Sequence, residues 1–175
     1  MYLENENIRL RALEPEDLDI LYKWENNTDI WQVGCTTEPY SRYILKEYIA
    51  YSDRTIYEKK QLRLMITRKE DDVTVGIIDL TDFDPHNLRA GIGLLLDAPF
   101  RGKGYALQAM NLLRDYAFGF LHLKQLYVHI PVTATESLQL FKTHGFTHTG
   151  TMQQWIRQGE AFVDVTIWQC INEVK

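Results

Sequence analysis

Glycine and proline are scarce in this sequence of 175 residues, which holds 10 and 5 of them, while 12% of its residues are aromatic. This composition excludes collagen-like, low-complexity and disordered chains. No stretch approaches the roughly 20 consecutive apolar residues that a membrane-spanning helix needs. We therefore expect a single globular domain over residues 1–175 that does not associate with membranes.

Cysteine is scarce as well, since the sequence has only Cys35 and Cys170, far apart and without the spacing of a metal or redox motif. Two free thiols fit a reducing cytoplasm. The first residues, MYLENENIRLRAL, are polar and acidic where a secretory signal would be basic and then apolar, so we expect no export. His144 and His148 flank a turn without a carboxylate to complete a ligand set, and we expect no metal.

Basic residues are fewer than acidic ones, 19 against 24, and the net charge of −5 argues against nonspecific nucleic-acid binding. Residues 1–60 carry eight basic and twelve acidic side chains, whereas residues 97–146 carry five and three. An acidic half facing a mildly basic half suits a cationic substrate beside an anionic cofactor. A solvated surface of mixed sign is the commoner cause of such a pattern.

The hydrophobic periodicity predicts a mixed α/β chain in the order β-α-α-β-β-β-α-β-α-β-β. Expected strands cover residues 8–13, 62–67, 74–80, 90–96, 125–132, 146–154 and 161–171, and expected helices cover 15–26, 41–52, 103–121 and 135–144. Residues 27–39 are expected to be loop or irregular helix. The segment 90–132 should form a right-handed parallel β-α-β unit within a mostly antiparallel sheet that helices flank.

The most informative stretch is PFRGKGYA at residues 99–106, between a strand and the long helix. Gly102 and Gly104 allow backbone conformations and close approach that side chains block. Amides at the start of a helix bind an anion, and Arg101 and Lys103 would reinforce such a site. The spacing fits neither a Walker A loop nor a Rossmann fingerprint. A tight connection that needs glycine for its shape alone is the alternative.

Residues 101–106, RGKGYA, match the R/Q-x-x-G-x-G/A signature, and the chain resembles the GNAT superfamily of acetyl-CoA-dependent N-acetyltransferases. Residues 8–18 and 137–146 are similar to the branch that contains ribosomal-protein-alanine and spermidine acetyltransferases. The resemblance implies a GNAT-type sheet and transfer of acetyl from acetyl-CoA to a primary amine by direct attack. The acceptor would be a polyamine, a protein N-terminus or another small cationic amine.

The resemblance also implies which residues hold coenzyme A. Arg101 would lead into a loop whose amides grip the pyrophosphate, at Gly102, Lys103, Gly104, Tyr105 and Ala106. The two parallel strands would splay apart, so that the backbone of Leu94, Leu95 and Leu96 pairs with the pantetheine arm and a backbone N–H stabilises the developing oxyanion.

The family's usual asparagine and its tyrosine acid correspond here to Ala134 and Phe141, and phenylalanine donates no proton. We expect Phe141 to pack on the pantetheine arm or in the core. Ser137, one helical turn earlier, is our candidate for protonating the leaving thiolate, directly or through water. The alternative is that Ser137 only caps the helix or bonds locally.

The family often carries a glutamate near position 91, where this chain has Gly91. An aliphatic amine has a pKa near 10, so a base or proton path is still needed. The candidates are Glu25, Asp79, Asp82 and His129, and Glu25 is preferred because this branch places acceptor-site residues at the end of the first helix. A solvated glutamate and a structural histidine are the alternatives.

Aromatic residues cluster before position 57, namely Trp24, Trp31, Tyr40, Tyr43, Tyr48 and Tyr51. They could form an acceptor wall with cation–π contacts, although the helical spacing of the tyrosines favours a core role for most of the cluster. Two other functions fit the loop: a coenzyme A-binding module that has lost turnover, and a nucleotide-binding protein. Dimers are common in the family, but the sequence shows no interface signature.

Overall fold

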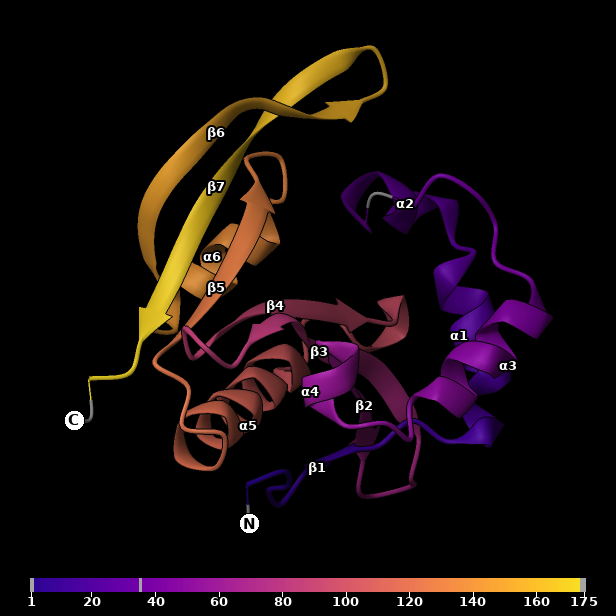
Figure 1. Cartoon of the computed structure of the whole chain (residues 1–175). Helices are drawn as coiled ribbons and strands as arrows, with labels where there is room; N and C mark the ends of the chain where they lie inside the picture. Colours follow the sequence, from indigo (N-terminus) through magenta and orange to yellow (C-terminus); the bar gives the residue numbers. More distant parts are fainter. Residues whose placement is uncertain (1, 35, 174–175) are drawn as a thin grey trace.

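The computed structural model describes residues 2–34 and 36–173, and these form one seven-stranded sheet with helices on both faces (Figure 1). The strands are β1 Ile8–Arg11, β2 Leu62–Arg68, β3 Thr74–Asp84, β4 Arg89–Leu96, β5 Gln125–Pro131, β6 Thr147–Gln158 and β7 Ala161–Ile171. The helices are α1 Leu18–Glu25, α2 Thr28–Gly34, α3 Arg42–Tyr51, α4 Ile56–Lys59, α5 Tyr105–Gly119 and α6 Thr135–Thr143, with 3-10 turns at Pro15–Asp17 and Ala98–Phe100.

The strand order in the sheet is β1-β2-β3-β4-β5-β7-β6. Within the described chain, β4 and β5 are the one parallel pair, and they pair only over Arg89–Gly91 and Gln125–Tyr127. Beyond that point β4 continues against β3, while β5 continues against β7. The two strands therefore diverge, as the family resemblance implied, and the side of β4 that faces β5 is left without a strand partner over residues 92–96.

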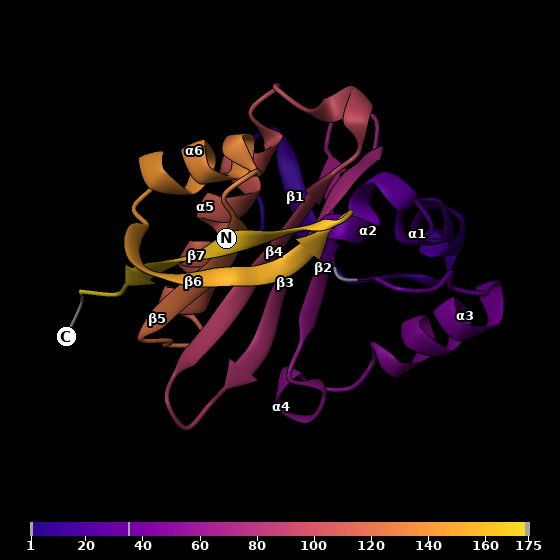
Figure 2. The ribbon, with the colours of Figure 1, turned by 90° about the horizontal axis from the view of Figure 1, so that it is seen from above.

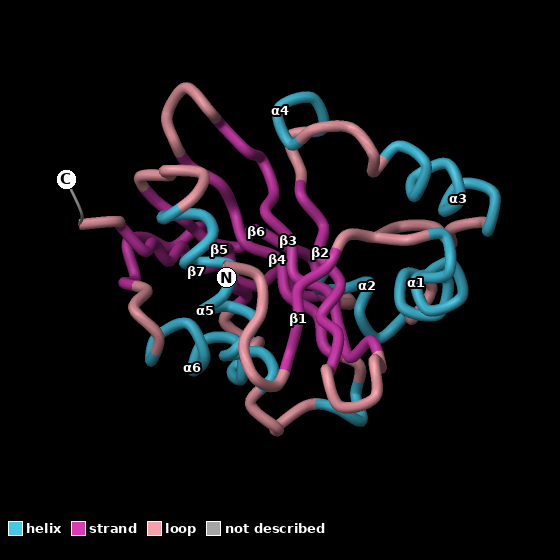
Figure 3. The backbone as a smooth tube through the Cα atoms, turned by 90° about the horizontal axis from the view of Figure 1, so that it is seen from below, coloured by secondary structure: helices cyan, strands magenta, loops and turns pink. Residues whose placement is uncertain are grey.

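Strict alternation along the central strands divides the core between the two faces of the sheet. Leu64, Ile78 and Ile92 face α5 and belong to the larger buried cluster. Met65 and Ile77 face the opposite way and pack with residues of α1 and α3. Figures 2 and 3 show α5 and α6 on one side of the sheet and α1 and α3 on the other.

The turn between β1 and α1 is fixed by a buried ion pair. Both terminal nitrogens of Arg11 donate to the carboxylate of Asp17 at 2.8 Å, and that carboxylate also accepts from the backbone N–H of Glu14 at 2.9 Å. Pro15 sits at the first position of the 3-10 turn, where its missing N–H costs nothing. The sequence EPED therefore sets where α1 starts and which residues reach its far end.

The predicted element order is confirmed, with two helices added. α2 lies within the stretch expected to be irregular, and the short α4 precedes β2. The long helix starts two residues later than predicted, because Gly102 and Gly104 have φ of 71° and 80°, outside the helical region. Among the described residues, no helix has the length and apolar character needed to cross a membrane.

Candidate functional site

The loop before α5 has the shape of an anion site. Gly102 and Gly104 lie in the left-handed region, and a Cβ added at either would meet nothing within 4 Å, so both face open space. Gly104 is the residue at the N-cap of α5, whose first amides point outward from a 15-residue helix. Arg101 anchors the loop, since its Nε donates to the carbonyl of Leu96 at 3.1 Å. These residues fit a pyrophosphate.

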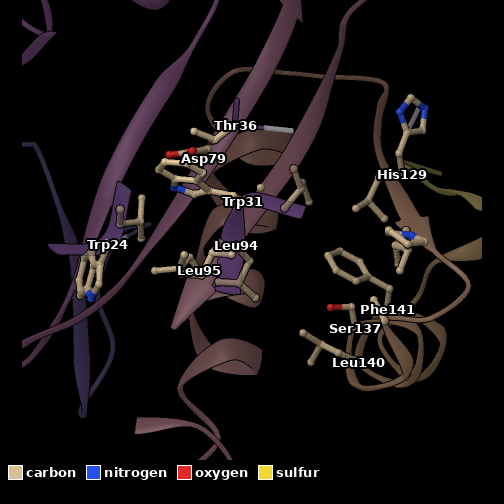
Figure 4. Close-up of a pocket in the computed structure, with 18 of the residues that line it drawn as sticks. Trp24, Trp31, Thr36, Asp79, Leu94, Leu95, His129, Ser137, Leu140 and Phe141 are labelled. Atoms are coloured by element: carbon tan, nitrogen blue, oxygen red, sulfur yellow. The ribbon is translucent and has the colours of Figure 1, made fainter. Parts of the chain in front are cut away.

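A central pocket of about 370 Å³ opens where β4 and β5 diverge (Figure 4). Helices α1 and α2 supply one wall, β2 to β5 supply the floor, and α6 supplies the far wall. Its lining is Trp24, Glu25, Ile30, Trp31, Thr36, Arg63, Ile77, Asp79, Ile92, Gly93, Leu94, Leu95, Val128, His129, Ile130, Pro131, Ala134, Ser137, Leu140 and Phe141. The pocket therefore joins the strand that we expect to hold the pantetheine arm to the residues around the end of α1.

The predicted cofactor residues lie along one path. Leu94 and Leu95 line the central pocket, and Leu96 lines a smaller pocket of about 160 Å³ together with Arg101. The side chain of Lys103 turns toward the ring of Phe100, with Nζ 5.7 Å from its centroid. The loop ends at Gly104, the N-cap of α5, and Tyr105 and Ala106 are the first two residues of that helix. The arrangement brings all these positions together, while their contacts with coenzyme A stay predictions.

Two acidic side chains share one guanidinium at the floor of the central pocket, and we call Glu25, Arg63 and Asp79 the Arg63 network. Asp79 accepts from Arg63 Nε at 3.0 Å and from Nη2 at 2.8 Å. Glu25 accepts from Arg63 Nη1 at 2.6 Å. With both carboxyl groups ionised, the network carries one excess negative charge.

Burial changes the pKa values of the groups in this network. The side chains of Arg63 and Asp79 are only 19% and 11% exposed. Burial raises the pKa of Asp79, although the charge and hydrogen bonds of Arg63 oppose the rise. Burial lowers the pKa of Arg63, but Asp79, Tyr48 and Glu25 outweigh it and raise that pKa overall, so the guanidinium stays charged. In its fully ionised form, this network would pair with one further cation.

Of the four candidate bases, two are inside the pocket and close to each other. Glu25 and Asp79 both bond Arg63. His129 contributes to the lining, but it is exposed, and Figure 4 shows its imidazole pointing away from the other labelled side chains. Asp82 does not contribute to the pocket lining. The geometry thus favours the two carboxylates over His129 and Asp82.

Ser137 and Phe141 lie one helical turn apart on α6, and Figure 4 shows both on the wall opposite Asp79. The ring of Phe141 is buried and meets Phe146 edge-on, with centroids 4.9 Å apart. It therefore packs in the core and also borders the pocket. Ala134, not Ser137, is the residue at the N-cap of α6, and within the described ranges the Ser137 hydroxyl makes no hydrogen bond. A capping role for Ser137 is thus excluded.

Arg63 lines the pocket and bonds two candidate bases, yet the sequence analysis did not single it out. The alternation of residues 62–67 already placed it on the face opposite Leu64 and Ile66, and thus on the face that Asp79 shares. Only the pairing of β2 with β3 places Arg63 directly beside Asp79. That register was not predictable from the separate strand patterns.

Two members of the predicted aromatic wall lie at the central pocket, while their contact with an acceptor stays a prediction. Trp24 and Trp31 line the central pocket, and the indole N–H of Trp31 donates to the carbonyl of Glu25 at 2.7 Å. The ring centroid of Tyr48 lies 5.4 Å from the guanidinium carbon of Arg63, a cation–π contact with the network. The core role expected for most of the tyrosines is wrong for three of them, since the exposed ones are Tyr40, Tyr43 and Tyr51.

Gly91, which stands near where the family often carries a glutamate, has a structural reason to be glycine. A Cβ there would lie 2.5 Å from Oγ1 of Thr81 and 3.4 Å from the ring of Tyr127. Any larger residue forces these neighbours to move. Position 91 therefore supplies no carboxylate, and the acidic groups of the pocket come from α1 and β3 instead.

The described residues contain no group of three or more His, Cys, Asp or Glu side chains that could hold a metal ion. Cys170 is a free, buried thiol, and burial raises its pKa. Cys35, the other predicted free thiol, lies outside the described residues. Among the described residues, no cysteine lines the central pocket.

Comparison with known proteins gives one family. The model described as "Acetyltransferase (GNAT) domain" matches residues 7–147. Spermidine N(1)-acetyltransferase of Escherichia coli K12 is 25% identical over 146 residues, which are 83% of this chain and 76% of that protein. Ribosomal-protein-serine acetyltransferase of the same organism is 25% identical over 113 residues, which are 65% of this chain and 63% of that protein.

Solved structures agree on the fold. Spermidine N-acetyltransferase from Vibrio cholerae, in complex with CoA and spermine, superposes with a TM-score of 0.86 at 23% identity, covering 95% of this chain and 96% of that one. A dodecameric structure of the enzyme from the same organism superposes with a TM-score of 0.80 at 24% identity, covering 95% of each chain. The mixed sheet with one parallel pair is thus a known architecture.

Proposed function

The chain belongs to the GNAT family of acetyltransferases, and we propose that the amine it acetylates is a small polycation of the polyamine type. Family membership makes the reaction the transfer of an acetyl group from acetyl-CoA to an amine. Acetyl-CoA supplies that group as an activated thioester. What the family does not fix is the acceptor, and the acceptor side of the central pocket carries the argument.

The observation that carries the proposal is the excess negative charge of the Arg63 network. One guanidinium is shared by Glu25 and Asp79 on the floor of the pocket, so when both carboxyls are ionised one carboxylate charge is left over. A unit charge attracts an ammonium at about 4 Å by roughly 4 kcal/mol at an effective dielectric constant of about 20. An amine that binds as its cation completes the pairing, whereas a neutral or anionic group does not.

Other features support a cationic acceptor. Trp24 and Trp31 line the same pocket, and indole rings attract ammonium groups. Curated relatives include spermidine N(1)-acetyltransferases from Escherichia coli and Vibrio cholerae. Residues 1–60, which supply α1 and α2, carry an acidic excess of four charges.

The proposed roles of the remaining residues follow from their places. The amides of Gly102 to Ala106 and the side chain of Arg101 hold the pyrophosphate at the start of α5. The unpaired side of β4 at Leu94 to Leu96 orients the pantetheine arm and presents a backbone N–H to the acetyl oxygen. Ser137, whose hydroxyl is free within the described part of the chain, donates the proton that the leaving sulfur needs.

A competition experiment tests the acceptor. Purified protein is incubated with acetyl-CoA and an equimolar pool of diamines, triamines, peptides with different N-terminal residues and aminoglycosides, and products are identified by mass spectrometry. The proposal expects acetylated triamine as the main product. Acetylated peptide as the main product would overturn it, as would coenzyme A release without any acetylated amine.

The second candidate acceptor is a protein N-terminus, which the ribosomal-protein-serine acetyltransferase among the relatives favours. The peptides in the pool decide between the two. The proposal includes a cytoplasmic location, which the free thiol of Cys170 supports. It also includes an oligomer, since a structural neighbour is dodecameric, and light scattering of the purified chain gives its mass in solution.

A further inference from the structure

An amine bound as an ammonium must lose a proton before its nitrogen has a lone pair to attack with. Its pKa near 10 means that very little free amine exists at neutral pH. A proton acceptor must therefore lie within hydrogen-bond reach of the nitrogen, directly or through one water. The central pocket offers Glu25, Asp79 and His129, and His129 points away from it.

Asp79 stands in a row that runs across three strands. Arg63 on β2 is the direct partner of Asp79 on β3, and Asp79 is the direct partner of Gly93 on β4. Partners in such a register project their side chains from the same face of the sheet. The row therefore places the carboxylate of Asp79 between a guanidinium on one side and a residue without a side chain on the other.

Gly93 leaves that carboxylate open toward the reacting end of the pocket. A Cβ at position 93 would stand 3.5 Å from Cβ of Asp79 and 3.6 Å from its Oδ2. These are ordinary van der Waals distances, so a methyl group would fit without strain and would cover the carboxylate. Leu94, the neighbour of Gly93, belongs to the stretch where the acetyl carbonyl is expected.

Glu25 differs from Asp79 in two ways. It ends α1, across the pocket from β4, and its carboxylate bonds the far nitrogen of Arg63, Nη1. It is also more exposed, with 25% of its side chain accessible against 11% for Asp79. Asp79 lies on a central strand held by neighbours on both sides, so its position is fixed by the sheet.

We propose that Asp79 is the catalytic base that takes the proton from the acceptor amine, that Arg63 is its positioning residue, and that Gly93 is glycine so that the amine reaches Asp79. The inference rests on the proposed function only in needing an amine, polycationic or not. Burial raises the pKa of Asp79 above its ordinary value, which makes it a better proton acceptor than an exposed aspartate.

The protons and bonds balance as follows. One proton passes from the ammonium to the Asp79 carboxylate and then to solvent. The nitrogen attacks the acetyl carbon, the nitrogen–carbon bond forms, and the carbon–sulfur bond breaks with its electron pair going to sulfur. Ser137 gives its hydroxyl proton to the sulfur, and the second proton lost by the nitrogen restores the hydroxyl of Ser137. The products are an amide, a thiol and one released proton.

The groups that face Asp79 set its titration. Arg63 comes from β2, Glu25 from α1 and Tyr48 from α3, and Gln61, just before β2, also bonds its carboxyl. Arg63 favours the ionised form, whereas Glu25 disfavours it. Rates should therefore fall at low pH as Asp79 takes up a proton, with a midpoint above the ordinary range of an aspartate.

The test is the pH profile of kcat, measured from pH 5 to 10 with the amine that the competition experiment identifies, whichever class it is. Asp79→Asn should lower kcat about 10²- to 10⁴-fold, the usual loss for a missing general base. Its remaining rate should rise about tenfold per pH unit toward the pKa of the amine. Asp79→Glu should restore part of kcat. A lower kcat with an unchanged pH profile would overturn the proposal.

Gly93→Ala removes access to Asp79 without removing a charge. We expect kcat/KM for the amine to fall roughly 10- to 100-fold, because a displacement of about 1 Å costs on this order. Gly150→Ala on β6 is the matched control, since its added Cβ would also make an ordinary contact, 3.9 Å from Ile167. Equal activity of the two alanine variants would contradict the role of Gly93.

A binding measurement without acetyl-CoA separates this inference from the proposed function. Trp24 and Trp31 report amine binding by fluorescence. Asp79→Asn should weaken binding of a triamine and move the rising limb of the kcat pH profile toward the pKa of the amine, whereas Glu25→Gln should weaken binding and leave that limb in place. If triamine does not bind the wild-type protein but another amine shows the pH-dependent limb of kcat, the proposed polyamine acceptor is wrong and Asp79 as the base still stands.

Discussion

Replacing Arg63 with methionine removes the guanidinium that bonds both Glu25 and Asp79 while keeping most of the side-chain volume. Removing one partner of a buried ion pair costs about 3 to 5 kcal/mol, because the other charge stays behind without compensation. Here two carboxylates stay behind. Since Arg63 is 19% exposed and Glu25 is 25% exposed, we expect a value near the lower end, about 3 kcal/mol.

The loss should depend on pH in a definite direction. Without Arg63, the folded-state pKa of Asp79, already raised by burial, moves further above its unfolded value near 4. A carboxyl whose pKa is higher in the folded state destabilises the fold at every pH above that folded pKa. The penalty is relieved as the pH falls through the folded pKa toward the unfolded one. Arg63→Met should therefore lose most at pH 7.5 and recover toward pH 5.

Urea unfolding followed by circular dichroism at pH 7.5 and pH 5 measures both effects. A loss of about 3 kcal/mol corresponds to a fall in Tm of roughly 6 to 12 °C for a chain of this size. The double variant Arg63→Met with Glu25→Gln removes one of the two charges and should regain part of the stability. A loss below about 1 kcal/mol at pH 7.5, or a loss equal at both pH values, would refute the reasoning.

Three further predictions concern the loop before α5, the proposed proton donor Ser137, and Gly91 at the point where β4 and β5 diverge. Gly104→Ala and Gly159→Ala both place a side chain at positive φ with open space around it, so each should cost about 1 kcal/mol of stability, but calorimetry should show at least tenfold weaker coenzyme A binding only for Gly104→Ala. Ser137→Ala should lower kcat by about tenfold or more with coenzyme A affinity unchanged, and an unaltered kcat would remove Ser137 from the mechanism. Gly91→Ala should lose about 1 to 3 kcal/mol because its Cβ would meet Thr81 Oγ1 at 2.5 Å, and the added change Thr81→Ala should restore most of that loss in a thermal melt.

The sequence predicted the fold well and drew attention to the loop before α5, because the signals for both are local. Alternating apolar residues define β2 and β3, and RGKGYA defines a strand-to-helix loop by its own glycines. The splay of β4 from β5 came from a family resemblance, and the register that shows it, pairing that ends at Gly91 and Tyr127, is visible only in the structure.

The acceptor side depends on contacts between distant segments. Glu25 and Asp79 were both candidates, yet nothing local joins positions 25, 63 and 79 into one network. Tyr43 and Tyr51 have the spacing of a buried helix face, but α3 lies at the edge of the fold and leaves both rings exposed. Helical spacing tells which residues share a face, and tertiary packing decides whether that face is covered.

The most direct test of the acceptor is the ratio of two specificity constants in the wild-type protein. The values of kcat/KM for a linear triamine and for a peptide α-amine are measured by coenzyme A release at one pH and low ionic strength. The account predicts a ratio above about 10 near pH 9, because the triamine with its pKa near 10 is still an ammonium there, whereas the peptide α-amine with its pKa near 8 is largely neutral and gains little from the charge of the Arg63 network. A ratio below one would contradict it.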